Sequence, residues 1–303
     1  MNTERHAVTG AFGYSGRHIA KRLLQRGHEV VTLTNKSAQA ELFERPIETC
    51  PLCFDAPDRL ARSLDGVRVL YNTYWVRFNH KNFTHADGIR NSGVLFEAAK
   101  RAGVERIVHV SIANPSEDSP FEYYHGKAVI EKKLRETGVS HSILRPTVLF
   151  GHGDILMNNI AWTLRRFPVV GYFGKGDYRI RPIHLDDFAD LAVEHGTHVG
   201  NETIDAVGPE DYTYKELLRT VADAIRRKNF LIPVPVWVGW SVAQFVGWCH
   251  NDTFLTWQEI GALRANLLTS DALTAGKISL RAWLAEHRDT IGRTYANELQ
   301  RRG

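Results

Sequence analysis

The segment Thr9-Gly10-Ala11-Phe12-Gly13-Tyr14-Ser15-Gly16 joins a short strand-like run to a helix-like segment. The run His6–Thr9 leads into it, and Ile19 and Leu23 follow at the spacing of an amphipathic helix. Glycines at such a junction permit a tight turn and a close approach of the backbone, so that a pyrophosphate can lie on the N-terminal amides of the helix. We therefore predict that residues 10–16 bind a dinucleotide; a plain glycine-rich turn is the alternative interpretation.

Strand-like runs alternate with helix-period segments through the first two thirds of the chain, as in repeated βαβ units. The predicted strands are His6–Thr9, Glu29–Leu33, Thr49–Phe54, Arg68–Asn72, Arg106–Val110, His141–Leu144 and Thr203–Ala206. The predicted helices are Gly16–Arg26, Pro57–Leu64, Ala86–Ala102, Phe121–Thr137 and Asp186–His195. This pattern predicts an α/β fold with a doubly wound parallel sheet, the Rossmann fold. We expect a dinucleotide-binding domain over residues 1–150 and a smaller substrate-binding lobe over residues 151–303, of which about 180–207 return to the sheet.

The composition is that of an ordinary globular protein: of 303 residues, 43% are hydrophobic, 24% are charged and 10% are aromatic. These fractions exclude a disordered, collagen-like or coiled-coil chain. Lysine and arginine number 38 against 34 acidic residues, a net charge of +4, and they form no basic arm. We therefore expect no nucleic-acid partner.

The three cysteines, Cys50, Cys53 and Cys249, are too few for a disulfide framework and fit a reducing compartment. Cys50 and Cys53 have a redox-like or zinc-like spacing, but they lie on a predicted strand with no second ligand pair nearby, so we predict no metal site. The first residues lack the basic start, apolar stretch and cleavage site of a secretory signal. These features predict a cytoplasmic protein.

The residues after the second predicted strand bear on which dinucleotide is bound. NAD-binding folds usually place an acidic residue there, where it meets the ribose hydroxyls. This strand instead runs into Asn35, Lys36 and Ser37. No carboxylate stands there to repel a ribose phosphate, and Lys36 can attract one. We predict NADP in preference to NAD, with these three residues near the phosphate; a solvated loop lysine is the alternative.

Tyr123 and Lys127 form a candidate acid/base pair. They lie four residues apart at the start of a predicted helix and therefore share one of its faces. A free phenol has a pKa of about 10, and an adjacent ammonium lowers this pKa because it favours the phenolate. Such a pair can move a proton on or off a carbinol oxygen while a cofactor takes or gives hydride.

Residues 229–251 contain no Asp, Glu, Lys or Arg and include Trp237, Trp240 and Trp248. Pro233 and Pro235 interrupt the segment, so it does not read as a spanning helix. Three interpretations stay open: a buried helix or the wall of an apolar substrate pocket, a patch that contacts a membrane surface, and a dimer contact.

Four motifs together resemble the short-chain dehydrogenase/reductase superfamily: the glycine-rich segment, the pair Tyr123/Lys127, the run Leu144–Gly151 and the run Arg181–Asp187. The resemblance covers nearly the whole chain, strongly to about Asp187 and weakly thereafter. It is nearest to the extended or atypical branch, which includes nucleotide-sugar epimerases and dehydratases, NmrA-like proteins and the complex I accessory Rossmann subunit.

The resemblance implies a role for several residues in cofactor binding. Gly10, Gly13 and Gly16 match the dinucleotide loop. Asp55 matches the acidic residue that meets the adenine amine, and Ala56 and Asn72 are assigned to the same cofactor site. Pro146 and Thr147 match the segment that passes under the nicotinamide.

The resemblance also implies the catalytic residues. Tyr123 matches the general acid/base, and Lys127 matches its partner, which also holds the nicotinamide ribose. Ser111 is the best candidate for the family's catalytic hydroxyl, although it comes early after the fifth strand. On the substrate side Asn91 resembles the active-site asparagine. Topology extends this side to Tyr74, Trp75, Arg77, Arg181 and Trp237, with bulky rings where the family often has small residues.

The sequence therefore predicts an NAD(P)-dependent oxidoreductase, or an epimerase or dehydratase, that acts on a small molecule such as a lipophilic compound or a nucleotide sugar. The alternative is a catalytically silent NAD(P)H-binding sensor or assembly factor, in one version at a membrane surface through residues 229–251. The sequence does not indicate an oligomeric state.

Overall fold

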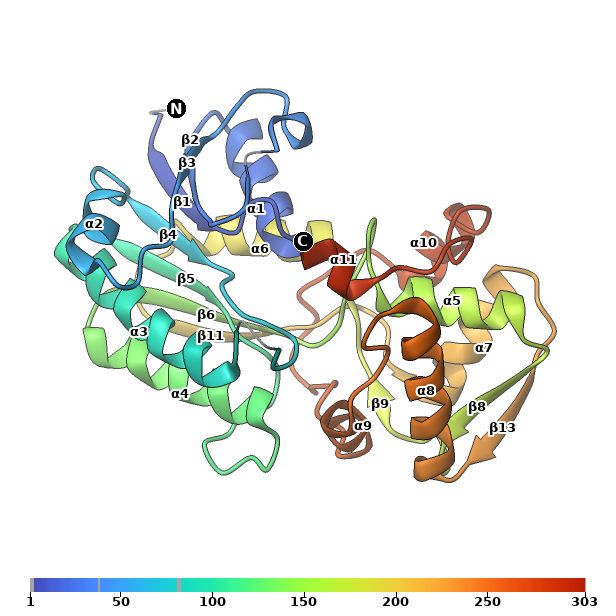
Figure 1. The fold of residues 1–303 in the computed structure, drawn as a ribbon. Coiled ribbons are helices and arrows are strands. Elements are labelled where there is room, and N and C mark those ends of the chain that lie inside the picture. The colour runs from blue at the N-terminus through green and yellow to red at the C-terminus, as the bar shows by residue number, and fades with distance from the viewer. Residues whose placement is uncertain (1–2, 38, 81–82, 303) are drawn as a thin grey trace. The chain divides into compact units, whose positions relative to one another are not determined.

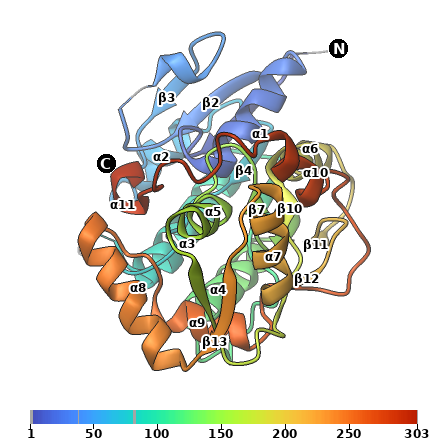
Figure 2. The ribbon, with the colours of Figure 1, turned by 90° about the vertical axis from the view of Figure 1, so that its right-hand side faces the viewer.

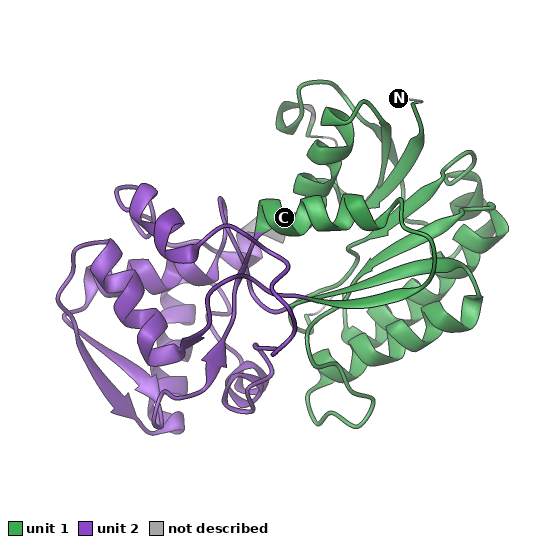
Figure 3. Cartoon of the chain, turned by 180° about the vertical axis from the view of Figure 1, so that it is seen from behind, with its two compact units in different colours: residues 1–146, 185–205 green, residues 147–184, 206–303 purple. Residues whose placement is uncertain are grey.

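The structure is a computed structural model that describes residues 3–37, 39–80 and 83–302. The chain forms two compact units, coloured separately in Figure 3. Unit 1 comprises Met1–Pro146 and Leu185–Asp205, and unit 2 comprises Thr147–His184 and Ala206–Gly303. Each unit has a hydrophobic core of its own.

Unit 1 is built around a seven-stranded sheet with the order β11-β6-β5-β4-β1-β2-β3. The strands are β1 (Arg5–Thr9), β2 (Glu29–Leu33), β3 (Glu48–Cys50), β4 (Val69–Asn72), β5 (Arg106–Val110), β6 (Ser140–Pro146) and β11 (Glu202–Ala206). Every pair from β6 to β3 is parallel. The strand order changes direction between β1 and β4, the switch point at which doubly wound sheets bind ligands. The predicted Rossmann fold is confirmed.

Helices cover both faces of this sheet (Figure 1). On one face α1 (Tyr14–Gln25) packs against α6 (Leu185–His195). The other face carries α2 (Pro57–Arg62), α3 (His85–Arg101) and α4 (Glu122–Thr137), and a short 3-10 turn, η1 (Ala40–Leu42), precedes β3. The five α-helices begin and end within two residues of their predicted bounds.

The core beneath α2, α3 and α4 explains why these segments form helices on that face. Leu70 and Ile107 of the sheet and Leu95 and Phe96 of α3 are fully buried in it. The start of α3 is fixed by a capping box, in which the Thr84 side chain accepts from the Asp87 amide and Asp87 binds back to Thr84. Burial of the apolar stripe stabilises the helix, and the cap fixes where it begins.

Arg106 holds the returning segment Leu185–Asp205 on the sheet. Its side chain is buried, and its guanidinium donates to the carbonyl oxygens of His195 (2.7 Å) and Gly200 (2.9 Å) and to the hydroxyls of Ser140 and Ser142. Each of these hydrogen bonds satisfies a buried polar group. The segment after the β10–α6 junction therefore belongs to the sheet.

One predicted strand is shorter than expected. The sequence pattern predicts Thr49–Phe54, whereas β3 ends at Cys50. Pro51 follows and has no amide hydrogen to continue the ladder with β2. Both Cys50 and Cys53 carry free thiols.

Unit 2 combines helices with three two-stranded sheets. Its strands are β7 (Leu149–Phe150), β8 (Val169–Phe173), β9 (Arg179–Ile180), β10 (Ile183–His184), β12 (Tyr212–Thr213) and β13 (Phe230–Val234). Its helices are α5 (Leu156–Arg166), α7 (Tyr214–Ala224), α8 (Val236–His250), α9 (Trp257–Arg264), α10 (Leu280–Glu286) and α11 (Glu298–Arg302). The core includes Phe150, Met157, Leu217, Val221 and Leu284.

The interpretation of residues 229–251 as a buried helix is wrong. This segment forms β13 and α8, and α8 exposes Trp237 (68%), Phe245 (63%) and Trp248 (79%). Only Ala243 and Gly247 of the helix are buried. Among the described residues, none of the helices combines the length and the apolarity needed to cross a membrane.

Candidate functional site

The glycine-rich segment forms a tight turn between β1 and α1. Gly10 has a φ of +65°, a conformation that side-chain-bearing residues rarely adopt, and its carbonyl accepts the Gly13 amide at 2.8 Å. Gly13 is the N-cap of α1, and the first turn, Tyr14-Ser15-Gly16, carries no carboxylate. The amides and the positive dipole end of α1 therefore favour an anion at this position.

Neighbouring strands hold this turn in place. The Ala11 amide donates to the Thr32 hydroxyl (3.0 Å), which itself donates to the Val8 carbonyl. The side chains of Ala11 and Phe12 are buried. Of the predicted loop residues, the side chains of these two contribute to packing. The backbone of the turn approaches itself closely where Gly16 meets Gly10.

Gly16 supplies the tightest contact of the turn, which makes it a sensitive test of the loop. A Cβ added at Gly16 would lie 2.4 Å from the Gly10 carbonyl oxygen, so the backbone must move. We expect Gly16→Ala to weaken NADPH binding by about tenfold or more, because the displaced turn no longer presents its amides to the pyrophosphate. Isothermal titration of the variant against the wild type measures this loss.

The matched control for Gly16→Ala is Gly93→Ala in α3. A Cβ at Gly93 would meet only the flexible Lys133 side chain, at 3.4 Å. This substitution is expected to raise stability by roughly 0.5–1 kcal/mol, because alanine is the better helix former, and to leave NADPH binding unchanged. Equal NADPH affinity in Gly16→Ala and wild type would contradict a cofactor role for the turn.

The loops after β2 and β3 are joined by Asn35. Its side-chain oxygen accepts the Leu52 amide (2.8 Å), and its side-chain nitrogen donates to the Leu52 carbonyl (3.3 Å). The Lys36 amide donates to the Thr34 hydroxyl. Residues 35–37 thus lie beside the chain that leads to Asp55, which is exposed, and Ala56, the N-cap of α2.

Asn72 is fully buried at the end of β4, and its side chain is used within the sheet. The amide oxygen accepts from the Thr9 hydroxyl (3.1 Å) and the Tyr74 amide (3.1 Å), and the nitrogen lies 3.1 Å from Nδ1 of His109. Burial lowers the pKa of His109 well below its ordinary value, so this imidazole is neutral. Asn72 therefore links the ends of neighbouring strands at the carboxyl edge of the sheet through its side-chain hydrogen bonds.

Tyr123 and Lys127 lie one turn apart on α4, as expected. Lys127 is 2% exposed, and its Nζ donates to the Val110 carbonyl at 2.7 Å. Burial lowers the pKa of Lys127 to about 7, against the opposing effect of Glu131. The ammonium group is therefore close to its titration point at neutral pH.

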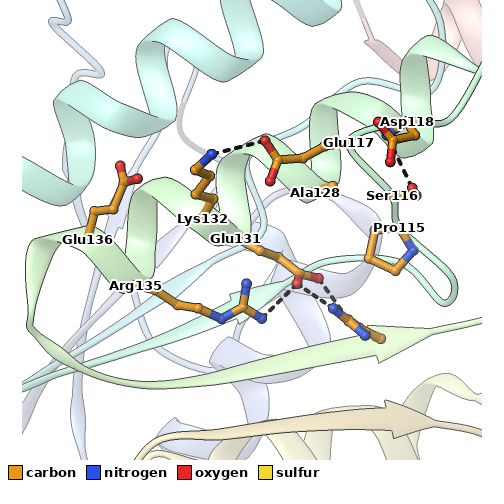
Figure 4. A pocket seen from close by; sticks show the side chains of 10 residues that line it. Pro115, Ser116, Glu117, Asp118, Ala128, Glu131, Lys132, Arg135 and Glu136 are labelled. Atoms are coloured by element: carbon orange, nitrogen blue, oxygen red, sulfur yellow. Dashed lines mark hydrogen bonds and ion pairs between the residues drawn. The ribbon is translucent and has the colours of Figure 1, made fainter.

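The next turn of α4 carries Glu131, which the sequence analysis did not select. This carboxylate is 1% exposed and is held by Arg145 of β6 through two hydrogen bonds (2.9 and 2.6 Å) and by Arg135 (3.0 Å). Figure 4 shows Glu131 and Arg135 at the pocket lined by α4 and the loop Pro115–Asp118. In the sequence, Glu131 follows Lys127 by four residues, as Lys127 follows Tyr123. This spacing could have identified Glu131 as a residue on the same face of the helix.

Ser111 donates its hydroxyl to Glu131 at 2.6 Å. Burial alone would raise the pKa of Glu131, but hydrogen bonds from Arg145, Ser111 and Arg135 outweigh it, so the pKa lies below its ordinary value. The structure therefore joins Ser111 to an ionised carboxylate one turn beyond Lys127. The hydroxyl proton of Ser111 is committed to that contact.

Aromatic rings surround Tyr123. The Trp75 ring lies edge-on to Tyr123 (5.8 Å), stacks on His85 (5.1 Å) and has the Lys127 Nζ at 5.0 Å from its centroid. It fits between α3 and α4 because Gly88 and Gly126 have no Cβ there; the built Cβ atoms would lie 2.5 and 2.7 Å from the indole.

The other predicted substrate residues, Tyr74 and Asn91, bind each other: the Asn91 amide donates to the Tyr74 hydroxyl at 2.9 Å. Burial raises the pKa of Tyr74 to about 12, so this phenol stays protonated. Of the pocket residues predicted from topology, Arg77 packs over Phe78 in unit 1. The ring contacts bring Trp75 to Tyr123, whereas Tyr74, which holds Asn91, contacts Phe54 and Phe83.

The remaining predicted residues are held by backbone contacts. In unit 1 Pro146 ends β6, and its carbonyl accepts the Ala113 amide. In unit 2 the Thr147 hydroxyl donates to the Arg181 carbonyl. The Arg181 guanidinium binds the carbonyl oxygens of Gly208, Ser270 and Ala272, which is a structural arrangement within unit 2.

Comparison with known protein families supports the dinucleotide loop. Residues 10–155 match a family of NAD(P)H-binding domains. The match begins at the first glycine of the turn and includes Tyr123, Lys127 and Glu131.

Curated relatives include a mitochondrial subunit and a bacterial reductase. The chain is 25% identical over 237 residues to the mitochondrial NADH dehydrogenase [ubiquinone] 1 alpha subcomplex subunit 9 of Dictyostelium discoideum, covering 75% of this chain and 66% of that protein. It is 28% identical over 237 residues to a ceramide reductase of Caulobacter vibrioides, covering 76% and 73%. The chain thus spans just under two thirds of the first of these relatives.

Among solved structures, a nucleoside-diphosphate-sugar epimerase from Staphylococcus aureus superposes with a TM-score of 0.71 at 16% identity, over 98% of this chain and 100% of that one. This likeness concerns the fold. The prediction of a cytoplasmic location is contradicted, because relatives from Dictyostelium discoideum, Mus musculus and Arabidopsis thaliana are named as mitochondrial proteins.

Proposed function

We propose that this chain is an NAD(P)-dependent oxidoreductase of the extended short-chain dehydrogenase/reductase type that uses Tyr123 and Lys127; the match of residues 10–155 to a family of NAD(P)H-binding domains supports the cofactor part of this proposal. The observation that carries the proposal is the α4 arrangement, in which a buried lysine lies one turn from a tyrosine. Burying an amine costs free energy, and here the buried Nζ is held by the Val110 carbonyl one turn from Tyr123.

The residues present fit the dinucleotide. The Gly10–Gly16 turn is closed tightly on itself, since a Cβ at Gly16 would lie 2.4 Å from the Gly10 carbonyl oxygen, and the N-terminus of α1 offers amides to a pyrophosphate. Residues 35–37, Asp55 and Ala56 would lie toward the adenosine end, and Pro146 and Thr147 toward the nicotinamide. When bound, the dinucleotide supplies or accepts the hydride.

Proton transfer falls to residues of the chain itself. The Tyr123 hydroxyl gives a proton to, or takes one from, the substrate oxygen. The positive charge of protonated Lys127, one turn away on α4, would stabilise the phenolate form of Tyr123. The Val110 carbonyl fixes Nζ of Lys127, and Glu131, held by Arg145, keeps a negative charge one turn away that favours the ammonium form.

Ser111 has a positioning part in this proposal. Its hydroxyl is donated to Glu131, so it supports the carboxylate rather than the substrate oxygen. On the substrate side the rings of Trp75, His85 and Tyr74 favour a lipophilic carbonyl or carbinol compound over a highly charged one. The ceramide reductase relative supports the same class of substrate.

The proposal is tested by hydride exchange. Purified full-length protein is given NADPH or NADH together with long-chain ketones, aldehydes, quinones and nucleotide sugars, and the loss of absorbance of the reduced nicotinamide is followed. Turnover of a lipophilic carbonyl compound is the expected result. Tight dinucleotide binding with no turnover across the panel would contradict it.

We expect NADPH to bind more tightly than NADH. The β2 end lacks a carboxylate, and Lys36 is one of the residues that follow this strand, where dinucleotide-binding folds meet the ribose 2′ substituent. An exposed ion pair of about 1 kcal/mol corresponds to roughly fivefold in Kd. Lys36→Ala should raise the Kd for NADPH by that factor and leave the Kd for NADH unchanged, as measured by fluorescence titration, whereas Lys36→Arg should retain the preference. Tighter binding of NADH by the wild type would reject the NADP preference.

A second candidate function is a non-catalytic NAD(P)H-binding subunit of a larger assembly. The committed hydroxyl of Ser111 favours it, as do the subunit 9 relatives. The turnover assay separates the two candidates, because a silent subunit binds the dinucleotide and exchanges no hydride.

A further inference from the structure

The helix α8 has its large side chains on the outside and its small ones on the inside. Gly239, Ala243 and Gly247 recur every four residues and form the packed face: a Cβ at Gly239 would lie 2.3 Å from the Phe173 ring, and one at Gly247 2.6 Å from the Asp252 carbonyl oxygen. The opposite face carries Trp237 and Trp248. This order is the reverse of a helix that is stabilised by burying its aromatic residues.

These aromatic residues form one part of a larger exposed apolar surface on unit 2. We define the docking surface as the following side chains, with their exposed fractions: Trp237 68%, Trp240 37%, Phe245 63%, Trp248 79%, Phe167 45% and Phe230 73%. Phe230 pairs with Val169 in the β13/β8 sheet, which lies beside α8 in Figures 1 and 2. Monomeric proteins seldom leave so many large rings in water without a partner.

The two parts of the docking surface are linked through Trp162. The His250 ring at the end of α8 lies 5.1 Å from the Trp162 ring, and the Phe167 ring lies 6.2 Å from it. The Asn229 amide donates to the Phe167 carbonyl at 2.6 Å, which ties the start of β13 to the end of α5.

Cations border the docking surface at its Phe167 and Phe230 end. Arg166 lies with its guanidinium carbon 5.4 Å from the Trp162 ring centroid, and the Arg227 guanidinium donates to the Arg165 carbonyl. Arg226, Arg227 and Lys228 are consecutive and exposed, and Asp223 is the acidic residue on the turn before them. Residues 229–251 themselves contain no Asp, Glu, Lys or Arg, so burying them in an interface desolvates none of these charged side chains.

We propose that unit 2 docks on an anionic lipid bilayer, with the rings of the docking surface in the interfacial layer and the Arg166/Arg226/Arg227/Lys228 cluster on lipid phosphates. Tryptophan favours the membrane interface, and basic residues beside it bind anionic headgroups. With 15 residues, α8 is too short to cross a bilayer and would lie in its plane. A second copy of this chain fits less well, since residues 229–251 offer the basic cluster no carboxylate to pair with.

The experiment is co-sedimentation of the full-length protein with vesicles of phosphatidylcholine alone or of equimolar phosphatidylcholine and phosphatidylglycerol. We expect binding to the anionic vesicles that weakens as salt is raised. The double variant Trp237→Ser/Trp248→Ser should lower the partition coefficient by about tenfold or more, because interfacial affinity scales with buried apolar area. Arg226→Gln/Lys228→Gln should lower it by roughly thirtyfold on anionic vesicles, the effect of two cations near the surface.

The matched control is Leu273→Ser, which removes an apolar side chain that is 93% exposed in unit 2 but lies outside the docking surface. It is expected to bind vesicles as the wild type does. Equal sedimentation with both kinds of vesicle, or binding that the tryptophan double variant retains, would overturn the proposal. A third outcome would also overturn it: the protein does not bind to either kind of vesicle, and sedimentation velocity shows a dimer that Trp237→Ser/Trp248→Ser abolishes.

Discussion

Tyr123→Phe is expected to lower kcat for hydride exchange by about 100- to 10,000-fold, the usual contribution of a positioned general acid or base. Only the hydroxyl is removed. The ring keeps its contacts with Trp75 (5.8 Å), His85 (5.9 Å) and Tyr124 (5.7 Å), so α4 and the dinucleotide turn should be undisturbed. Steady-state kinetics on the substrate found in the turnover assay give kcat, and titration gives the Kd for NADPH, which should stay near that of the wild type.

The control for this result is Tyr124→Phe, which removes the same group from the neighbouring position. Tyr124 is 5% exposed and packs against Phe121. Its variant is expected to keep most of the turnover. If both variants lost activity equally, the loss would reflect helix packing; if Tyr123→Phe kept full activity, Tyr123 would not be the general acid or base.

The second large effect concerns stability. Arg145→Met removes both hydrogen bonds that β6 makes to the buried carboxylate of Glu131. We expect the free energy of unfolding at pH 7 to fall by about 3–5 kcal/mol, the cost of breaking a buried ion pair on one side. Urea unfolding of the full chain gives the free energy, and hydrogen exchange of the α4 amides shows whether the loss is local to this helix.

The pH dependence of this loss has a definite sign. In the wild type the pKa of Glu131 is lowered, so its stabilising effect is present above the ordinary carboxyl pKa and is lost as the pH falls through the folded-state value. Without Arg145, the hydrogen bond and the charge that most oppose the effect of burial are lost, so the pKa of Glu131 rises from its wild-type value and the native variant takes up a proton more readily. The difference between wild type and variant should therefore narrow as the pH is lowered from 7 towards 4.

Lys132→Met provides the comparison on the same helix. The Lys132 side chain is 56% exposed and pairs with Glu117 at 3.2 Å in the pocket of Figure 4. An exposed pair of this kind contributes about 0–1 kcal/mol, so this variant should unfold close to the wild type at every pH. A loss as large as that of Arg145→Met would mean that α4 responds to any charge removal rather than to the buried carboxylate.

The dinucleotide-binding half of the chain could be predicted with good bounds because its signals are local. A strand, a Gly10–Gly16 turn and an amphipathic helix follow one another within one segment, and the spacing of apolar residues places α3 and α4 on the sheet. Tyr123 and Lys127 share a face because four residues make about one helical turn. The bounds of β3 were predicted wrongly: the strand ends at Cys50, because Pro51 has no amide hydrogen to continue the ladder.

The candidate site was predictable to a smaller extent. Ser111 comes at the expected place in the chain, yet its hydroxyl direction is set by Glu131, which lies 20 residues further on. The partners of Glu131 come from the residue after β5, from α4 and from β6, so no single window of sequence contains the network. The bulky Trp75 is accommodated by Gly88 and Gly126, which lie on two different helices.

The amino-acid sequence alone was sufficient to predict the α/β class, the glycine-rich turn and the tyrosine–lysine pair. Each of these features depends on residues that are close together along the chain. Long-range packing settled which carboxylate holds Ser111, how far the amine of Lys127 is buried, and whether the aromatic residues of α8 face a core or water. The physical reason is that burial and pKa depend on everything that surrounds a side chain. A charge-free run of tryptophans is equally compatible with a core and with a surface, until Gly239, Ala243 and Gly247 turn one face of α8 inward.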